Sequence, residues 1–363
     1  MKYLIFTLTI IIIGISTKGQ QKTYVPDDTF EALLESYGMG DGIADNDSVT
    51  TASISTVDSL IIFNDFISDL TGIEDFTSLQ YLDCHNNFLS TLDFSNNTTL
   101  KKLLCSDNLI DTIDLSNCMA LEYLDLDTNF IENVDLSNCV NLQTLYLNYN
   151  FIENIDLRSC TKLEYLYLDD NFIDSLDVIQ NIALKTFWCF NNYLESIDLS
   201  NNSLLEVIYL DSNFLSCLNL KNDNNTNITR VFAQGNSNLT CIEVDDSSYS
   251  NSNWINNSNF YFDSNHFFSE NCNYSSDCFN SLNGVIVNKS SSLTVFPNPT
   301  NNIVNIKLDN YDGEINLQLY DFTGKLLKVI NNRSLSLEDC PKGIYLLKVS
   351  YDDIIKRINV VKY

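Results

Sequence analysis

A run of near-identical segments, each 21 residues long, constrains this chain more than any other feature. LEYLDLDTNFIENVDLSNCVN (121–141) is followed by LQTLYLNYNFIENIDLRSCTK (142–162) and LEYLYLDDNFIDSLDVIQNIA (163–183). All follow the frame Leu-x-x-Leu-x-Leu-x-x-Asn-x-Ile, and its asparagine recurs at Asn87, Asn108, Asn129, Asn150, Asn171, Asn192 and Asn213. A looser copy ends at Asn236, and Asp65 holds this place in an earlier one. Such a period predicts a solenoid of about nine stacked turns, because one turn cannot bury its apolar face alone.

Within each copy, alternating apolar residues such as Leu145 and Leu147 predict one short strand with these side chains facing inward. Stacked turns then form a parallel sheet with strands about 4.8 Å apart. Ile152, Ile155 and Leu157 would fill the other half of the core. A 21-residue turn leaves too few residues for a crossover helix, so we expect extended or short 3₁₀ segments there. The asparagine column is predicted to be structural, with its amides satisfying backbone groups at the buried bend.

This spacing resembles the leucine-rich-repeat family, which implies an α/β-type solenoid that is mostly β. In that family ligands usually meet the concave strand face, whose outward residues lie two, four and six places before each asparagine. These columns contain a cluster of aromatic and acidic residues, which we predict to be the ligand-binding site: Tyr123, Tyr146, Tyr165, Tyr167, Trp188, Phe190, Tyr209, Asp125, Asp127, Asp169 and Asp211. An exposed aromatic strip rimmed by carboxylates favours a protein or glycan ligand, and the acids favour a cationic one. The alternative is that the rings only stabilise the sheet.

Two further columns run along the repeats. One follows the asparagines, and we interpret it as rings packed on one another at the sheet rim, with ligand contact as the alternative: Phe66, Phe88, Leu109, Phe130, Phe151, Phe172, Tyr193 and Phe214. The other is acidic: Asp93, Asp114, Asp135, Asp156, Asp177 and Asp198. For these carboxylates we favour hydrogen bonds to the backbone two residues on, with calcium between turns as the alternative. No cofactor is otherwise predicted.

The array needs end caps, and the sequence offers one at each end. Residues 21–56 form the N-terminal cap, in which Asp27 and Asp28 precede an apolar helical pattern that ends at Gly38. The repeats occupy 57–240. Residues 241–287 form the C-terminal cap and linker, which is rich in Ser and Asn and carries Trp254 and Phe260.

Lys2 and the apolar run from Tyr3 to Ile15 indicate a signal peptide over residues 1–20, which is too short to span a membrane. The net charge of −28 argues against nucleic-acid binding and against anionic lipid. We predict no membrane span.

Eleven cysteines in an exported chain suggest disulfides, but most occupy repeat positions, where buried thiols act as small hydrophobes. A bridge within the column Cys118, Cys139 and Cys160 is the less favoured reading. The favoured bridge uses two of four cysteines near the cap: Cys217, Cys241, Cys272 and Cys278.

The segment 292–363 differs in character from the repeats. VFPNPT (295–300), LQLYDFTGKLL (317–327), CPKGIYLLKV (340–349) and IIKRINVV (354–361) are short alternating runs separated by turns, as a small β-sandwich requires. They resemble the type A C-terminal sorting domain of type IX secretion. The resemblance implies contact with that secretion machinery, export to the cell surface or beyond, and a sorting motif: Pro297, Asn298, Pro299, Gly324, Gly343, Tyr345, Lys356 and Arg357.

Enzyme signatures are missing from the sequence. The two histidines, His85 and His266, have no evident nucleophile or metal partner, and no Gly-rich phosphate loop occurs. We therefore predict a non-catalytic, adhesin-like binding protein. The alternative is a passive structural component of the cell-surface layer.

Overall fold

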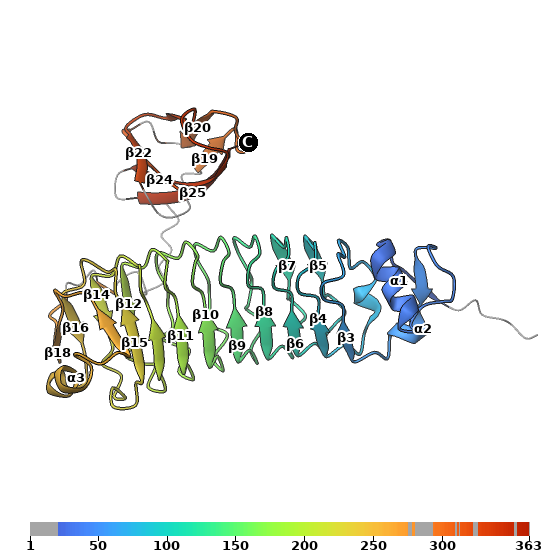
Figure 1. Ribbon diagram of the computed structural model, residues 1–363, viewed down its shortest axis with the longest axis horizontal. Coiled ribbons are helices and arrows are strands. Elements are labelled where there is room, and N and C mark those ends of the chain that lie inside the picture. Colours follow the sequence, from blue (N-terminus) through green and yellow to red (C-terminus); the bar gives the residue numbers. More distant parts are fainter. Residues whose placement is uncertain are drawn as a thin grey trace, which may run out of the picture. The chain divides into compact units, whose positions relative to one another are not determined.

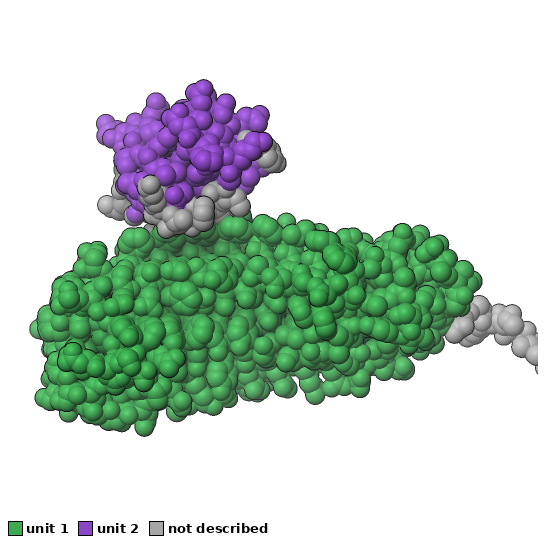
Figure 2. All heavy atoms as spheres, viewed as in Figure 1, with its two compact units in different colours: residues 1–284 green, residues 285–363 purple. Residues whose placement is uncertain are grey.

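The computed structural model describes residues 21–274, 278–279, 293–308, 311, 313–321, 326–351 and 354–362. The chain divides into two compact units, residues 1–284 and 285–363, which Figure 2 colours separately. The predicted signal peptide and Gly324 lie outside the described residues.

The first unit is a solenoid built on a ten-stranded parallel sheet (Figure 1). Each turn contributes one short strand: β3 (Ser59–Ile61), β4 (Tyr81–Asp83), β6 (Lys102–Leu104), β8 (Tyr123–Asp125), β9 (Thr144–Tyr146), β10 (Tyr165–Tyr167), β11 (Thr186–Trp188), β13 (Val207–Tyr209), β15 (Arg230–Ala233) and β17 (Phe260–Phe262). Neighbouring strands pair so that equivalent repeat positions face each other, as Leu145 faces Leu166. Equivalent residues therefore form straight columns, and the predicted leucine-rich-repeat architecture is confirmed.

The opposite arm of each turn is extended, as predicted. It forms two short parallel sheets from β5 (Thr91–Asp93), β7 (Thr112–Asp114), β12 (Ser196–Asp198), β14 (Cys217–Asn219), β16 (Cys241–Glu243) and β18 (Phe267–Ser269). One 3₁₀ turn, η1 (Ile73–Asp75), lies near the N-terminal end. The core fills the space between the two arms, where Leu145, Ile152 and Leu157 are at most 1% exposed.

The buried asparagines hold successive turns together. Asn150 Nδ2 donates to the carbonyls of Leu126, Leu147 and Asn148 at 2.9–3.2 Å, and its Oδ1 accepts from the backbone N–H of Ile131 at 3.0 Å. Each amide thus satisfies backbone groups in its own turn and in the preceding one. The predicted structural role of this column is confirmed.

The N-terminal cap consists of a two-stranded sheet, β1 (Lys22–Tyr24) and β2 (Ser48–Thr50), with the helices α1 (Asp28–Ser36) and α2 (Thr51–Ile54). Asp27 caps α1, because its carboxylate accepts from the backbone N–H groups of Thr29 and Phe30 at 3.0 Å. The same carboxylate also accepts from Ser68 in the first repeat, so it ties the cap to the solenoid.

At the other end, the sheets continue into the cap instead of stopping at its start. β17 pairs with β15, β18 pairs with β16, and α3 (Ser247–Asn253) lies beside them. Trp254 is 1% exposed, and its ring stacks on that of Phe260. Two disulfides fasten this end, Cys217–Cys278 and Cys241–Cys272, so all four predicted cysteines are bridged.

The cysteines of the repeat columns remain free thiols in the core. Cys118, Cys139 and Cys160 occupy three consecutive turns at one repeat position of the opposite arm. Asparagines hold this position in the turns on either side, where Asn97 and Asn181 donate to backbone carbonyls of earlier turns. Burial raises the pKa of Cys139 to about 11, so its thiol stays protonated at neutral pH.

The second unit consists of two antiparallel sheets. One contains β19 (Leu293–Phe296), β20 (Ile303–Leu308) and β23 (Ser334–Ser336), and the other contains β21 (Asn316–Tyr320), β22 (Leu326–Ile330), β24 (Gly343–Tyr351) and β25 (Ile354–Lys362). Buried residues including Leu319, Leu335 and Leu347 form its core. These sheets match the predicted small β-sandwich.

Several residues of the predicted sorting motif stabilise this unit. Asn298 Oδ1 accepts from the backbone N–H of Val361 in β25 at 2.9 Å. The buried Tyr345 donates to the carbonyl of Pro341 at 2.6 Å. Lys356 and Arg357 lie in β25, where their backbones pair with those of Val349 and Lys348.

Candidate functional site

The solvent-facing side of the ten-stranded sheet, here called the concave face, carries a continuous row of aromatic rings. One ring comes from each of seven consecutive strands, and we call this row the concave stripe: Tyr123, Tyr146, Tyr167, Trp188, Tyr209, Phe232 and Tyr261. Each ring lies within 5.7 Å, centroid to centroid, of the next. The register of the sheet places equivalent repeat positions side by side, so the six rings from Tyr146 to Tyr261 form one column. Tyr123 joins them from the neighbouring column, because Asp125 is the residue that pairs with Tyr146.

The rings differ in their orientation relative to one another. Tyr146 and Tyr167 stack face to face, with centroids 4.3 Å apart and an interplanar angle of 3°. Trp188 then stands nearly edge-on to Tyr167, at 80°. Stacked rings cover each other's faces, so Tyr146 and Tyr167 offer mainly ring edges and hydroxyl groups to a ligand. Trp188 Nε1 is buried without a protein acceptor, so the fold itself does not use this donor.

Two of these rings were not predicted from the sequence. Phe232 lies in a copy whose spacing departs from 21 residues, and Tyr261 lies in the cap outside the repeat frame. Their pairing with β13 and β15 extends the stripe by two strands. The usable signal was the β-branched and aromatic residues of Arg-Val-Phe-Ala and Phe-Tyr-Phe, which favour strands.

The other predicted site residues lie beside the stripe. Tyr165 is 37% exposed, and the ring of Phe190 lies 6.3 Å from that of Trp188. The four predicted aspartates lie on the same face, and burial raises the pKa of each. For Asp125 the pKa rises to about 6 and for Asp169 to about 7. These two groups exchange protons near neutral pH, so the charge of the face depends on pH.

Basic groups lie near both ends of the stripe and contact its rings. Lys102 Nζ lies 4.3 Å from the ring centroid of Tyr123. Arg230 donates to the hydroxyl of Tyr209 at 2.9 Å. Nearby, His85 Nδ1 pairs with Asp83 at 2.6 Å and stacks on Phe63. These side chains are already engaged within the chain.

The column that follows the asparagines forms a second row of apolar side chains, which we call the rim row: Phe66, Phe88, Leu109, Phe130, Phe151, Phe172, Tyr193 and Phe214. Its rings pack on one another as predicted, with centroids 5.8 Å apart between Phe130 and Phe151 and 5.7 Å apart between Tyr193 and Phe214. Many of these side chains nevertheless remain exposed to solvent.

The acidic column on the opposite arm makes the predicted backbone contacts. Asp114, Asp135 and Asp156 each accept from the backbone N–H two residues on, at 2.8–3.0 Å. The Ser137 N–H lowers the pKa of Asp135, and Arg158 lowers that of Asp156 to about 2. Within the described ranges, no group of three or more His, Cys, Asp or Glu side chains is arranged to hold a metal ion.

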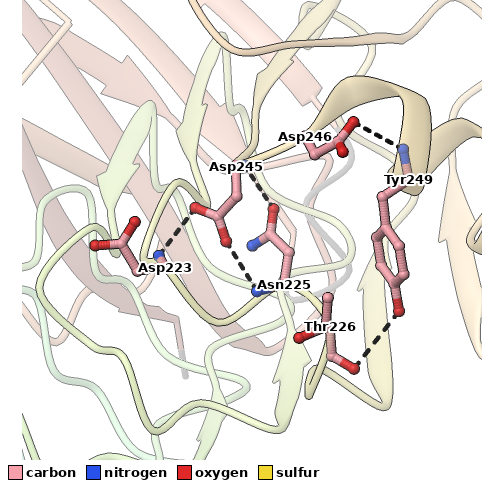
Figure 3. Close-up of a pocket in the computed structure, with 6 residues that line it drawn as sticks. All are labelled: Asp223, Asn225, Thr226, Asp245, Asp246 and Tyr249. Atoms are coloured by element: carbon pink, nitrogen blue, oxygen red, sulfur yellow. Dashed lines mark hydrogen bonds between the residues drawn. The ribbon is translucent and has the colours of Figure 1, made fainter.

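A hollow at the C-terminal end is lined by Asp223, Asn225, Thr226, Asp245, Asp246 and Tyr249 (Figure 3). Its polar groups bind one another. Asp245 accepts from the backbone N–H groups of Asp223 and Asn225 at 2.9 Å, and Asp246 caps α3. The hollow therefore reflects how the cap is fastened to the last turns.

Two family models match the chain. One, described as a secretion system C-terminal sorting domain, matches residues 294–362, and the other, described as leucine-rich repeats in two copies, matches residues 140–181. No curated protein matches the chain.

Solved structures similar to this chain include two from Listeria monocytogenes and one from Yersinia pestis. An internalin C2 from Listeria monocytogenes is 23% identical, with 61% of this chain and 97% of that chain covered and a TM-score of 0.46. The functional domain of InlJ from Listeria monocytogenes, which includes a cysteine ladder, is 19% identical, with 94% and 99% covered and a TM-score of 0.33. YopM, a leucine-rich effector protein from Yersinia pestis, is 23% identical, with 47% and 46% covered and a TM-score of 0.37.

None of the helices in the described part of the chain has the length and apolar character needed to cross a membrane.

Proposed function

We propose that this chain, a leucine-rich-repeat protein with a C-terminal sorting domain, binds a polypeptide partner through its concave stripe. The sorting domain marks the chain for type IX secretion to the cell surface or the outside of the cell. The partner is therefore a molecule met at that surface or beyond it. In this role the protein acts as an adhesin-like binding protein and carries out no reaction.

One observation carries the proposal, namely the unbroken row of seven rings across seven strands. Aromatic residues supply much of the binding energy at protein interfaces, because they bury a large area and lose little conformational freedom. Here the sheet register and ring packing already fix their positions. Little ordering is therefore needed when a partner binds.

Ring orientation favours a polypeptide over a glycan. A sugar ring stacks on an exposed aromatic face, whereas Tyr146 and Tyr167 cover each other's faces. Their edges and hydroxyl groups suit the apolar side chains and backbone groups of a protein. The carboxylates of Asp125 and Asp127 beside the stripe add a preference for basic side chains.

The test is a screen of the purified protein against phage-displayed random peptides and against a glycan array. We expect enriched peptides whose binding weakens about tenfold or more in Tyr167→Ala and in Trp188→Ala. Tyr167→Phe keeps the ring and reports on the hydroxyl alone. The matched control is Phe172→Ala, which removes a ring from the rim row in the same turn. Circular dichroism melts establish that each variant is folded.

The outcomes separate the alternatives. If a glycan binds and Trp188→Ala abolishes its binding, the concave stripe remains the binding site but its ligand is a glycan and not a polypeptide. Ligands that bind all concave variants as tightly as the unmodified protein would refute the assignment of the site. The absence of any ligand in both screens would favour a passive structural component of the cell-surface layer.

A further inference from the structure

The rim row is a second apolar surface that the proposed function leaves unused. Phe66 is 73% exposed, Phe214 54% and Phe88 50%. At roughly 200 Å² for a whole side chain, the five most exposed members leave about 500 Å² of apolar surface. The largest patch on a typical monomer is about 300–600 Å², and three further rings of this row add to the total here. Packing of the rings on one another therefore leaves a continuous apolar ridge.

The backbone holds this ridge in a fixed register. From Phe88 onward, each residue of the row donates its N–H to a carbonyl of the preceding turn, as Phe151 does to Ile131 and Phe172 to Ile152, both at 2.9 Å. Neighbouring ring centroids lie 5.7–6.0 Å apart between Phe66 and Phe88 and again from Phe130 to Phe214, with Leu109 between the two runs. A docking segment would thus meet an evenly spaced and preorganised surface.

A column of acids runs beside the middle of the ridge, two residues after each member from Leu109 to Tyr193, whereas serine holds this place after Phe66, Phe88 and Phe214. It spans five consecutive turns: Asp111, Glu132, Glu153, Asp174 and Glu195. The residue between ring and acid is buried, as for Ile131 and Ile152, so the ring and the acid of one turn both face outward. The ridge is therefore bordered by carboxylates over these five turns.

These charges determine which occupant fits. The chain carries a net charge of −28, so a second copy, an anionic membrane and a nucleic acid would all be repelled from an acidic border. A basic polypeptide would be attracted to it. Arginine suits both rows, because its guanidinium pairs with carboxylates and stacks on aromatic rings.

We propose that the rim row and its acid column dock an extended segment of a partner protein in which apolar and basic residues alternate. An extended chain places alternate side chains on one side about 6.6–6.8 Å apart. This is within about 1 Å of the ring spacing, so a short segment can meet two or three neighbouring rings. A strand lying along the boundary between the two rows directs one set of side chains to the rings and the other set to the carboxylates. This site is separate from the concave stripe.

The probe is a synthetic peptide of alternating arginine and valine, compared with a peptide of the same composition whose arginines and valines stand in separate blocks. Binding to the purified full chain is measured by fluorescence anisotropy. We expect tighter binding of the alternating peptide, and a loss of about tenfold or more in the double variant Phe151→Ala/Phe172→Ala. Asp111→Asn/Glu132→Gln/Glu195→Gln keeps every ring, so it should weaken binding and reduce its dependence on salt.

Ile182→Ala serves as the control, because it removes an apolar side chain that is 58% exposed and lies outside both the rim row and the concave stripe, so it should leave binding of this peptide unchanged. Tyr167→Ala is measured alongside to separate the two surfaces: binding that Tyr167→Ala weakens and Phe151→Ala/Phe172→Ala does not would belong to the concave stripe and would overturn this proposal. Equal binding of the alternating and blocked peptides would overturn the proposal, because charge alone would then explain the affinity. Unchanged binding in the folded Phe151→Ala/Phe172→Ala variant would also overturn it. Two other results would overturn it as well. One is self-association of the unmodified chain in sedimentation that the Phe151→Ala/Phe172→Ala variant abolishes. The other is binding of the unmodified chain to neutral lipid vesicles that this variant abolishes.

Discussion

Replacing Asp169 by asparagine should stabilise the repeat unit, and increasingly so as the pH rises. Asp169 is 3% exposed, and burial raises its pKa to about 7, with further contributions from Asp170 and Asp127. An aspartate in the unfolded chain has a pKa of about 3.9. Between these values the folded state binds more protons than the unfolded state, so stability falls as the pH rises through this window. At about 1.4 kcal/mol per pKa unit the full difference is about 4 kcal/mol, and relaxation around the carboxylate should reduce the gain to about 1–2 kcal/mol.

The assay is urea unfolding followed by circular dichroism at pH 4 and pH 8. We expect Asp169→Asn to match the unmodified protein at pH 4 and to exceed its stability at pH 8. The control is Asp135→Asn on the opposite arm, where the Ser137 N–H lowers the pKa of the carboxyl. That contribution is present above the unfolded pKa and is lost as the pH falls, so Asp135→Asn should give no gain at pH 8. An Asp169→Asn variant with no gain at pH 8, or with the same gain at both pH values, would refute the reasoning.

Three further predictions concern the buried asparagines, the buried thiols and the concave face. Asn150→Ala should lower the free energy of unfolding in urea by about 3 kcal/mol, because it leaves the buried Ile131 N–H and nearby carbonyls unpaired. Asn141→Ala at the surface should lower it by less than about 0.5 kcal/mol, and equal losses would contradict the structural role of the buried asparagines. Cys118, Cys139 and Cys160 should resist a maleimide in the native protein and react once it is unfolded, because burial raises the pKa of each thiol to about 11–12; rapid native labelling by mass spectrometry would contradict this. Binding of basic peptides to the concave stripe should tighten between pH 5 and pH 8, because Asp125 and Asp169 lose protons in this range. The control is the double variant Asp125→Asn/Asp169→Asn, whose affinity should not change with pH.

The sequence predicted the fold well because the repeat period forces it. Once Leu145 and Leu166 hold the same place in successive turns, the sheet register and the columns of Asn150 and Tyr146 follow without further information. The type of N-terminal cap was also readable, since Asp27 precedes an apolar helical pattern. Prediction was weaker where the period breaks. Phe232 and Tyr261 join the concave stripe through strand pairing, which the repeat frame does not contain.

Other properties depend on packing in three dimensions. The sequence gives the acids of the concave face but not their burial, which raises the pKa of Asp125 and Asp169 toward neutrality. Ring packing in the rim row was predicted, yet the exposed area that remains on Phe66 and Phe214 could not be read from the pattern. The pairing of the four cap cysteines likewise depends on how the chain folds back over the last turns.

Hydroxyl-radical footprinting tests the concave-stripe assignment most directly, because tyrosine and tryptophan side chains report on their own solvent contact. The protein is labelled alone and with a peptide selected in the phage screen, and oxidation is measured residue by residue by mass spectrometry. The account predicts that the peptide protects Tyr146, Tyr167, Trp188 and Tyr209 while the oxidation of Tyr149 and of the cap residue Tyr37 is unchanged. Unaltered oxidation of the four stripe residues at saturating peptide, with protection elsewhere, would contradict it.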